Sequence, residues 1–209
     1  TDGSYFLVAD PARGDGADYS AIQVFDSKTM NQAAEYQGKL PLDMFASLIM
    51  DVSKEYGNCL TIVENNSIGL SVITKLQEMG HPNLYWSKKN THEQVNSVLV
   101  EDQSGVICGF TNTVKTRPLI IAKLEEFIRN RVIKINSLRL ANELKTFIWK
   151  SGKAQAMRTY NDDLVMACAI ACWIRDTALV ANSRETKYEQ RVIIKNENEK
   201  VINLPFFIG

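Results

Sequence analysis

Acidic residues stand at the edges of three apolar segments that lie far apart in the chain. Asp10 and Glu64 each follow a short apolar run, and the pair Asp162 and Asp163 comes directly before a long one. The end of a buried strand holds a side chain firmly yet leaves it open to solvent, which suits a group that must bind a cation and admit substrate. The spacing therefore predicts a metal site built from separated carboxylates.

The types of residue favour a hard divalent cation. Such ions prefer oxygen ligands and keep several waters, so a few carboxylates suffice. The chain has only two histidines, and its four cysteines include no C-x-x-C pair, so a zinc cluster is not expected. Two divalent ions about 3.5–4 Å apart can activate a water and neutralise the leaving oxygen of a phosphodiester. The alternative is that Asp10 only orders a turn and that Asp162 or Asp163 only caps a helix.

Helix geometry separates the two adjacent aspartates. Consecutive residues of a helix project about 100° apart, so only one of the pair can face the sheet edge. Asp163 shares a face with Met166, Ala167 and Ile170, and this apolar face must pack on the sheet. We therefore predict Asp163 as the ligand and Asp162 as a cap or an auxiliary ligand.

The elements that must position these acids follow from periodicity. The first half of the chain alternates, with strands predicted at 5–9, 21–25, 33–37, 60–63 and 84–86 and helices at 41–56 and 68–79. The second half is mainly helical, with helices predicted at 117–130, 137–147 and 162–179 and a brief strand at 132–135. The first three strands are joined by short turns, as antiparallel neighbours are, whereas the strand at 84–86 can lie parallel to its predecessor across a helix. The expected fold class is α/β, with a mixed sheet flanked by helices.

The remaining segments are predicted to be turns, loops or caps. Thr116 and Ser137 are expected to cap the helices that follow them. Residues 87–115 are polar and broken by glycine, which favours a long loop or a small hairpin. The segment 149–153 is predicted to be a cation-rich turn, and the charged tail from 182 is not placed by its pattern.

Length, charge and hydrophobicity limit the classes of protein to which the chain can belong. The chain has 209 residues and 45% hydrophobic content, which is enough for a sizeable core. Its 24 Lys and Arg balance its 24 Asp and Glu, so any site for a polyanion must be a local patch. No apolar run is long enough to span a membrane, and the start Thr1-Asp-Gly is neither a signal peptide nor an initiator methionine. We expect one domain over 1–209 with its core at about 5–180, in a reducing compartment and cut from a longer polypeptide.

Three motifs resemble those of a known family. They are Val8-Ala-Asp10-Pro-Ala-Arg-Gly14-Asp-Gly16-Ala-Asp18-Tyr-Ser20, then Val63-Glu64-Asn65-Asn66 followed by Gly69, and finally Asn161-Asp-Asp-Leu-Val-Met-Ala167. In order and separation they are similar to the acidic motifs of the nuclease domain in the large terminase subunit of tailed bacteriophages, of the T4-like type. The resemblance covers roughly residues 5–180. It implies a ribonuclease-H-like fold in which Asp10, Glu64 and Asp163, assisted by Asp162, bind two Mg²⁺ or Mn²⁺ ions and cut concatemeric genome DNA during head filling.

The resemblance also implies partners and a location. Double-stranded DNA is the expected substrate, and in the full-length family protein the ATPase motor domain, the portal and the small terminase subunit are partners. The expected place is the host cytoplasm and, transiently, the prohead portal, without a membrane. No G-x-x-x-x-G-K-[ST] string is present, so the ATPase domain is expected to be absent from this chain.

Two residues near the motifs are expected to be auxiliary. Asn161 stands where the family often has histidine, and an amide can hydrogen-bond but cannot exchange a proton near neutral pH. Asp18 follows Gly14 and Gly16, where it binds an outer water of the metal or fixes the turn.

A site that cuts DNA also needs cations for the phosphate backbone. The candidates beside the motifs and in the long loop are Arg13, Lys88, Lys89, Lys115, Arg117, Lys150, Lys153 and Arg158. The alternative for many of them is solvated surface charge.

The sequence thus predicts a metal-dependent DNA endonuclease that reads the backbone, with Asp10 bridging the two ions. Three alternatives stay open. A Holliday-junction-resolvase-like or transposase-like nuclease would have the same fold. An actin-like ATPase or sugar kinase also has a strand that ends in aspartate before a glycine turn. In a non-catalytic interaction domain the acids would only order turns.

Overall fold

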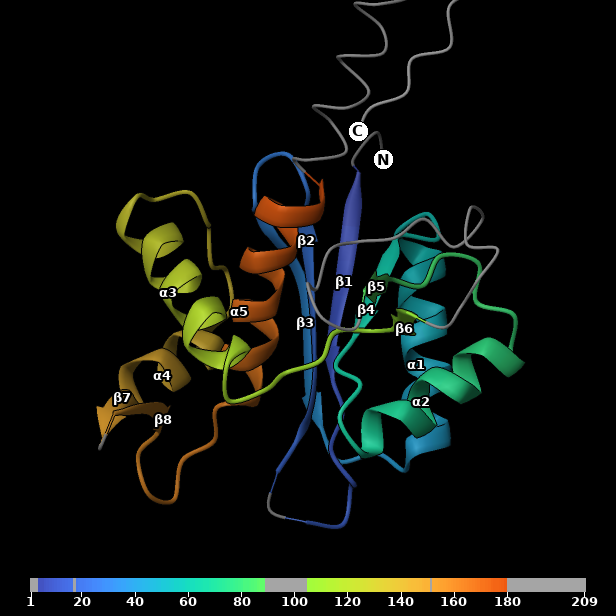
Figure 1. Cartoon of the computed structure of the whole chain (residues 1–209), viewed down its shortest axis with the longest axis horizontal. Helices are drawn as coiled ribbons and strands as arrows, with labels where there is room; N and C mark the ends of the chain where they lie inside the picture. Colours follow the sequence, from blue (N-terminus) through green and yellow to red (C-terminus); the bar gives the residue numbers. More distant parts are fainter. Residues whose placement is uncertain (1–3, 17, 89–104, 151, 180–209) are drawn as a thin grey trace, which may run out of the picture.

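A four-stranded mixed sheet lies at the centre of the computed structural model, which describes residues 4–16, 18–88, 105–150 and 152–179 (Figure 1). Its strands, in the spatial order β3-β2-β1-β4, are β1 (Tyr5–Asp10), β2 (Ser20–Asp26), β3 (Gln32–Gly38) and β4 (Leu60–Val63). The first three are antiparallel neighbours, and β4 pairs in parallel with β1. The predicted mixed sheet is therefore confirmed.

Helices cover both faces of the sheet, so the molecule has three layers (Figure 1). One face carries α1 (Leu42–Glu55) and α2 (Ile68–Glu78). The other carries α3 (Thr116–Arg129), α4 (Leu138–Thr146) and α5 (Asp163–Ile174), and a π-helical turn (Arg175–Leu179) continues α5. These are the five helices that periodicity predicts. In the part of the chain that the structure describes, none of them is long and apolar enough to cross a bilayer.

Side-chain alternation along the strands decides which way the acids point. Phe6 and Val8 of β1 are buried against α3 and α5, whereas Leu7 is buried against α1 and α2. Asp10 follows Val8 by two residues and so faces α5. In β4 the same face is marked by Ile62, and Glu64 follows it by two residues. Both acids are therefore directed to the side on which α5 lies.

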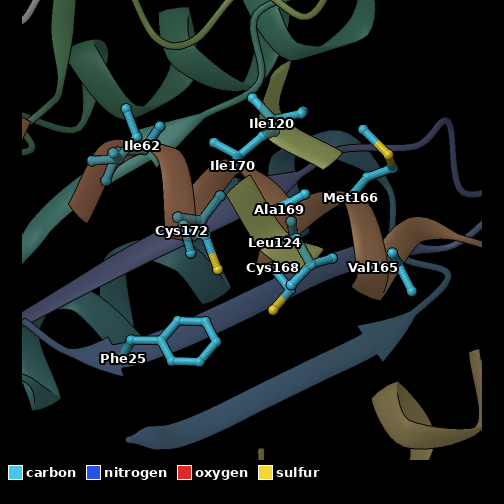
Figure 2. Close-up of a cluster of buried hydrophobic side chains, with 14 of the residues drawn as sticks. Phe25, Ile62, Ile120, Leu124, Val165, Met166, Cys168, Ala169, Ile170 and Cys172 are labelled. Carbon is cyan, nitrogen blue, oxygen red and sulfur yellow. The ribbon is translucent and has the colours of Figure 1, made fainter. Parts of the chain in front are cut away.

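The core on the α5 side explains the apolar stretch after Asp163. Figure 2 shows Cys168 and Cys172 of α5 packed with Leu124 of α3 and Phe25 of β2. All four cysteines of the chain are buried and free, and they fill the core as small apolar side chains. This packing fixes α5 against the sheet.

Two strand predictions are corrected by the structure. The predicted strand at 132–135 is absent, and only Lys134 forms a bridge, with Asn31. The predicted strand at 84–86 is reduced to one parallel bridge between Leu84 and Thr61. Both patterns are too short to tell a strand from a single bridge. The chain instead forms β5 (Trp86–Lys88), which pairs antiparallel with β6 (Val106–Cys108).

The loops and caps also differ in part from the predictions. The pairing of β5 with β6 favours the hairpin alternative for 87–115, although 89–104 lie outside the described residues. The predicted turn at 149–153 joins the hairpin strands β7 (Phe147–Lys150) and β8 (Lys153–Ala156). Ser137 caps α4 as predicted, since its Oγ accepts a hydrogen bond from the Leu140 N–H at 3.0 Å.

Thr116 does not cap α3, because it lies inside the helix. The hydroxyl of Thr113 does this work instead: it accepts hydrogen bonds from the backbone N–H groups of Lys115 at 3.2 Å and Thr116 at 3.1 Å. A second threonine three residues earlier competes for the same role, and the sequence alone does not rank the two.

A glycine lets α2 begin directly behind the end of β4. A Cβ atom on Gly69 would overlap the backbone carbonyl oxygen of Glu64. Gly109 makes a similar close approach to the Val63 carbonyl, at a positive φ of 86°. The backbone that carries Glu64 is thus enclosed by two glycines that no other residue replaces without strain.

Replacing Gly69 with alanine should destabilise the fold although alanine is the better helix former. The added methyl group forces α2 away from β4, and overpacking of this kind costs about 1–3 kcal/mol. The free energy of unfolding from urea titration measures the effect. Gly16→Ala is the control, because no atom lies within 4 Å of the added Cβ at that position. Equal stability of the two variants would contradict the prediction.

Candidate metal centre

The structure brings together the carboxyls at the ends of β1, β4 and the start of α5. Burial raises the pKa of Asp10 well above its ordinary value, and the neighbouring charges of Glu64, Asp163 and Asp162 raise it further. Charges influence a pKa in this way when the groups lie within about 10 Å of one another. Four acids from three distant segments therefore share one edge of the sheet.

Asp10 and Glu64 are close enough for their carboxyls to hydrogen-bond. Because a carboxylate is only an acceptor, such a bond requires that one of the two is protonated. The donor set fits a hard divalent cation, which neutralises the same charges as that proton and prefers the same oxygens. Among the described residues, no three His, Cys, Asp or Glu side chains are drawn tightly enough together to enclose an ion.

Asp163 is held by the loop before β2. The Tyr19 backbone N–H donates a hydrogen bond to Asp163 Oδ2 at 3.2 Å. Burial raises the pKa of Asp163 to about 6; the bond from Tyr19 lowers it, and the charges of Asp18 and Asp162 raise it. Asp18, predicted to be auxiliary, is therefore near the centre, at its exposed rim.

The glycine-containing loop after β1 is shaped by two contacts. A Cβ atom on Gly14 would overlap the Leu40 carbonyl oxygen, and φ at Gly14 is +84°. The buried hydroxyl of Ser20 accepts a hydrogen bond from the Ala12 N–H at 3.0 Å and lies 3.3 Å from the Ala12 carbonyl, to which it donates. These contacts fold the loop back so that Tyr19 reaches α5.

Asp162 is engaged by an arginine. Arg117 Nη2 donates to Asp162 Oδ2 at 2.7 Å, and Arg117 Nε and Nη2 each lie 3.3 Å from the Ala154 carbonyl oxygen of β8. The Arg117 side chain is only 22% exposed. This pairing occupies one oxygen of Asp162, and the choice of Asp163 as the ligand stays a prediction. Arg117, predicted to contact DNA, ties the hairpin to the acidic edge.

Glu64 has a partner, Asn66, to which the sequence motifs assign no role. Asn66 Nδ2 donates to Glu64 Oε1 at 3.0 Å and to the Asn112 carbonyl oxygen at 2.6 Å. The preceding Asn65 is buried and donates to the Cys108 carbonyl oxygen at 2.9 Å. Both asparagines belong to the Glu64 motif, so their position next to the acid is the sequence feature that could have indicated a role in holding it.

Glu143 of α4 is a further acid at this edge, and no motif marks it. Its Oε2 accepts a hydrogen bond from the Val165 N–H at 3.2 Å, and its Oε1 accepts one from Gln37 Nε2 at 2.5 Å. Burial raises the pKa of Glu143 to about 7; its bonds to Val165 and Gln37 lower it, and the charge of Asp163 raises it. Its place between Leu140 and Leu144 in the helix was the only hint that it faces inward.

The predicted cations divide into two groups. Lys150, Lys153 and Arg158 line an open groove of about 740 Å³ that also includes Arg117 and Asp162. This groove therefore runs up to the acidic edge with cationic side chains along it.

The other predicted residues lie elsewhere. Arg13 is exposed and pairs with Asp15 at 3.0 Å. Lys115 is exposed at the start of α3. Lys88 ends β5, but its side chain and all of Lys89 lie outside the described residues. Asn161 lies beside the acidic edge, where it and Glu143 line a cavity of about 490 Å³ that shares Tyr160 with the groove.

The raised pKa values predict how stability depends on pH without divalent ions. A folded carboxyl with a raised pKa binds its proton more tightly than in the unfolded chain, so its contribution is present below about pH 4 and is lost as the pH rises through about 6 for Asp163. A rise of the pKa from 3.8 to about 6 corresponds to about 3 kcal/mol at most, and solvent screening of this partly exposed group reduces the expected loss to on the order of 1–2 kcal/mol.

Urea unfolding in a chelator across this range of pH measures the effect. Asp163→Asn should flatten the decline, and millimolar Mn²⁺ should restore the stability of the wild type at neutral pH. An unchanged pH slope in Asp163→Asn would contradict the prediction.

No family model matches the chain. Among solved structures, it is similar to the large terminase nuclease from thermophilic phage G20c with bound magnesium, at 17% identity and a TM-score of 0.61 over 82% of this chain and 81% of that one. It is also similar to the large terminase nuclease domain of Thermus phage P74-26, at 19% identity and a TM-score of 0.57 over 81% and 78% of the two chains. A mutant nuclease domain of the large terminase subunit of bacterial virus Sf6, solved with manganese, matches at 12% identity and a TM-score of 0.54 over 81% and 88%. At these identities the similarity establishes the fold, and the predicted ribonuclease-H-like α/β class is confirmed.

Proposed function

We propose that this chain is the nuclease domain of a large terminase subunit of a tailed bacteriophage, of the T4-like type, and that it hydrolyses DNA phosphodiesters with divalent metal ions. The observation that carries the proposal is that β1 and β4, which lead into Asp10 and Glu64, pair in parallel, while the Tyr19 N–H ties Asp163 to the loop before β2. The three sequence motifs and the shared fold support the same conclusion.

In this function Asp10, Glu64 and Asp163 would hold two Mg²⁺ or Mn²⁺ ions, with Asp162 and Asp18 as auxiliary acids. When bound, the ions supply an activated water and neutralise the 3′-side oxygen that leaves. The chain's own contribution is orientation. The contact of Asn66 with Glu64 and that of the Tyr19 N–H with Asp163 support fixed positions for the two carboxyls.

The proposed substrate is double-stranded DNA, bound through its backbone. Lys150, Lys153 and Arg158 supply positive charge along the groove that ends at Asp162. Because the whole chain has no net charge, this local patch has to provide the attraction for phosphate. Contacts of this kind fix the strand without reading its sequence.

The biological setting follows from the same proposal. The domain, comprising residues 1–209 with its core at about 5–180, cuts concatemeric genome DNA at the start and end of head filling. Its partners are then the ATPase domain, the portal and the small terminase subunit, and it acts in the cytoplasm of the infected host, transiently at the prohead portal.

Neutralising any one of the three acids should abolish cleavage. Asp10→Asn, Glu64→Gln and Asp163→Asn are each expected to reduce nicking of supercoiled plasmid in Mg²⁺ or Mn²⁺ by more than about 100-fold, because each removes a ligand of the ions that carry the chemistry. The fold should remain, since each change removes a charge from a crowded acidic site.

Asp51→Asn, an exposed position in α1 on the opposite face of the sheet, is the control and should cleave as the wild type does. Full cleavage by one of the three variants removes that residue from the site. A strong preference of the wild type for four-way junctions over linear duplex would favour the resolvase-like alternative.

The groove should control affinity for DNA rather than chemistry. In an Asp163→Asn background that cannot cut, Lys150→Ala, Lys153→Ala and Arg158→Ala should each weaken duplex binding regardless of sequence. Each lost phosphate contact should reduce the slope of log K against log salt by about 0.9. Lys54→Ala, an exposed position in the last turn of α1, should leave the slope unchanged. Unaltered slopes in all three variants would exclude the groove as the binding surface.

A further inference from the structure

Glu143 connects three elements at the start of α5. It lies in α4, outside the segments that carry the acidic motifs, and both of its carboxyl oxygens are in use. One accepts the Val165 N–H in the first turn of α5, and the other accepts Gln37 Nε2 from β3. Both bonds join residues that are far apart in sequence.

The first turn of α5 needs an acceptor from outside its own helix. The first N–H groups of any helix have no partner within the helix, and a side chain at the N-cap position usually satisfies one of them. Asp162 occupies that position in α5 but makes no capping bond, because its carboxyl pairs with Arg117 instead. Glu143 takes over the capping role from another helix, and its negative charge suits the positive end of the helix dipole.

This cap lies next to the candidate metal ligand. Asp163 precedes Val165 by two residues, and the Tyr19 N–H holds its carboxyl from the sheet side. Gln23 of β2 also bonds to this turn, with its Nε2 at 3.4 Å from the Leu164 carbonyl oxygen. The position of the Asp163 backbone therefore depends on how Glu143 and Gln23 hold the turn against the sheet.

We propose that Glu143 is a positioning residue of the candidate metal centre, whose carboxyl holds the first turn of α5 and, through it, Asp163. The inference rests on the proposed nuclease function. Catalytic geometry tolerates little error, since a misplacement of about 1 Å costs roughly 100-fold in rate. Loss of the cap releases the Val165 N–H and lets this turn move.

The test compares Glu143→Ala with Glu143→Gln. Glutamine keeps an oxygen that can accept from Val165, whereas alanine keeps none. We expect Glu143→Ala to lower kcat for duplex cleavage in Mn²⁺ by about 10- to 100-fold with little change in KM, and Glu143→Gln to stay within a factor of about three of the wild type. If Glu143→Ala does not fold, Gln37→Ala loosens the same carboxyl and should lower kcat in the same direction by less.

A second readout does not depend on activity. In the metal-free protein, NMR should show faster amide hydrogen exchange at Leu164 and Val165 in Glu143→Ala but not in Glu143→Gln. Ser53→Ala is the matched control, because it removes a buried hydrogen bond, to the Cys59 carbonyl oxygen at 3.3 Å, on the opposite face of the sheet. It should lower Tm while kcat and these two exchange rates stay as in the wild type.

Each contrary outcome has one meaning. Wild-type kcat and wild-type exchange in Glu143→Ala would overturn the positioning role. Equal loss of kcat in Glu143→Gln and Glu143→Ala would also overturn it, because the charge and not the cap would then be required. Absence of metal-dependent cleavage by the wild type would instead refute the proposed function, and the exchange rates would still decide whether Glu143 holds the turn.

Discussion

Mutual repulsion among carboxylates is the constraint on which the rest of this structure depends. Asp10, Glu64, Asp162 and Asp163 share one partly desolvated edge, where each charge makes the next more costly. The protein offsets this with a backbone N–H at Asp163 and an arginine at Asp162. Crowded carboxylates of this kind are also what binds a divalent cation strongly, so the same repulsion that costs stability creates affinity for metal.

The fold supplies the rigidity that holds this arrangement together. Parallel pairing places the ends of β1 and β4 at the same edge, and alternation along the strands turns Asp10 and Glu64 to the same face. The apolar length of α5 packs on β1 and β2, with Asp163 at its first position. Gly69 then closes the backbone behind Glu64, where any side chain would collide. The strand pairing, the packing of α5 and the close approach at Gly69 are each local, but together they fix the acidic edge of the sheet.

Local patterns in the sequence predict the secondary structure, but they do not predict the contacts between distant segments. Alternation and helical periodicity predict the sheet and the helices, and helix geometry favours Asp163 over Asp162 as the ligand, which stays a prediction. The bonds of Glu143 and Arg117 could not be predicted, because each joins segments whose approach is decided only by packing. Thr116 failed as a cap for a smaller reason of the same kind, since a neighbouring hydroxyl made the better contact.

Arg117 links the acidic edge to the cationic groove through its hydrogen bonds. Its guanidinium bonds both to Asp162 and to the β8 backbone beside Lys153, so movement of the hairpin pulls on the start of α5. The acidic edge and the cationic groove also carry charges of opposite sign. Without a cation the acids repel a phosphate that the lysines attract, and a bound cation reverses the sign of that edge. Under the proposed function, metal binding and the approach of DNA would therefore be coupled, and cutting would be favoured only where an ion and a DNA backbone meet.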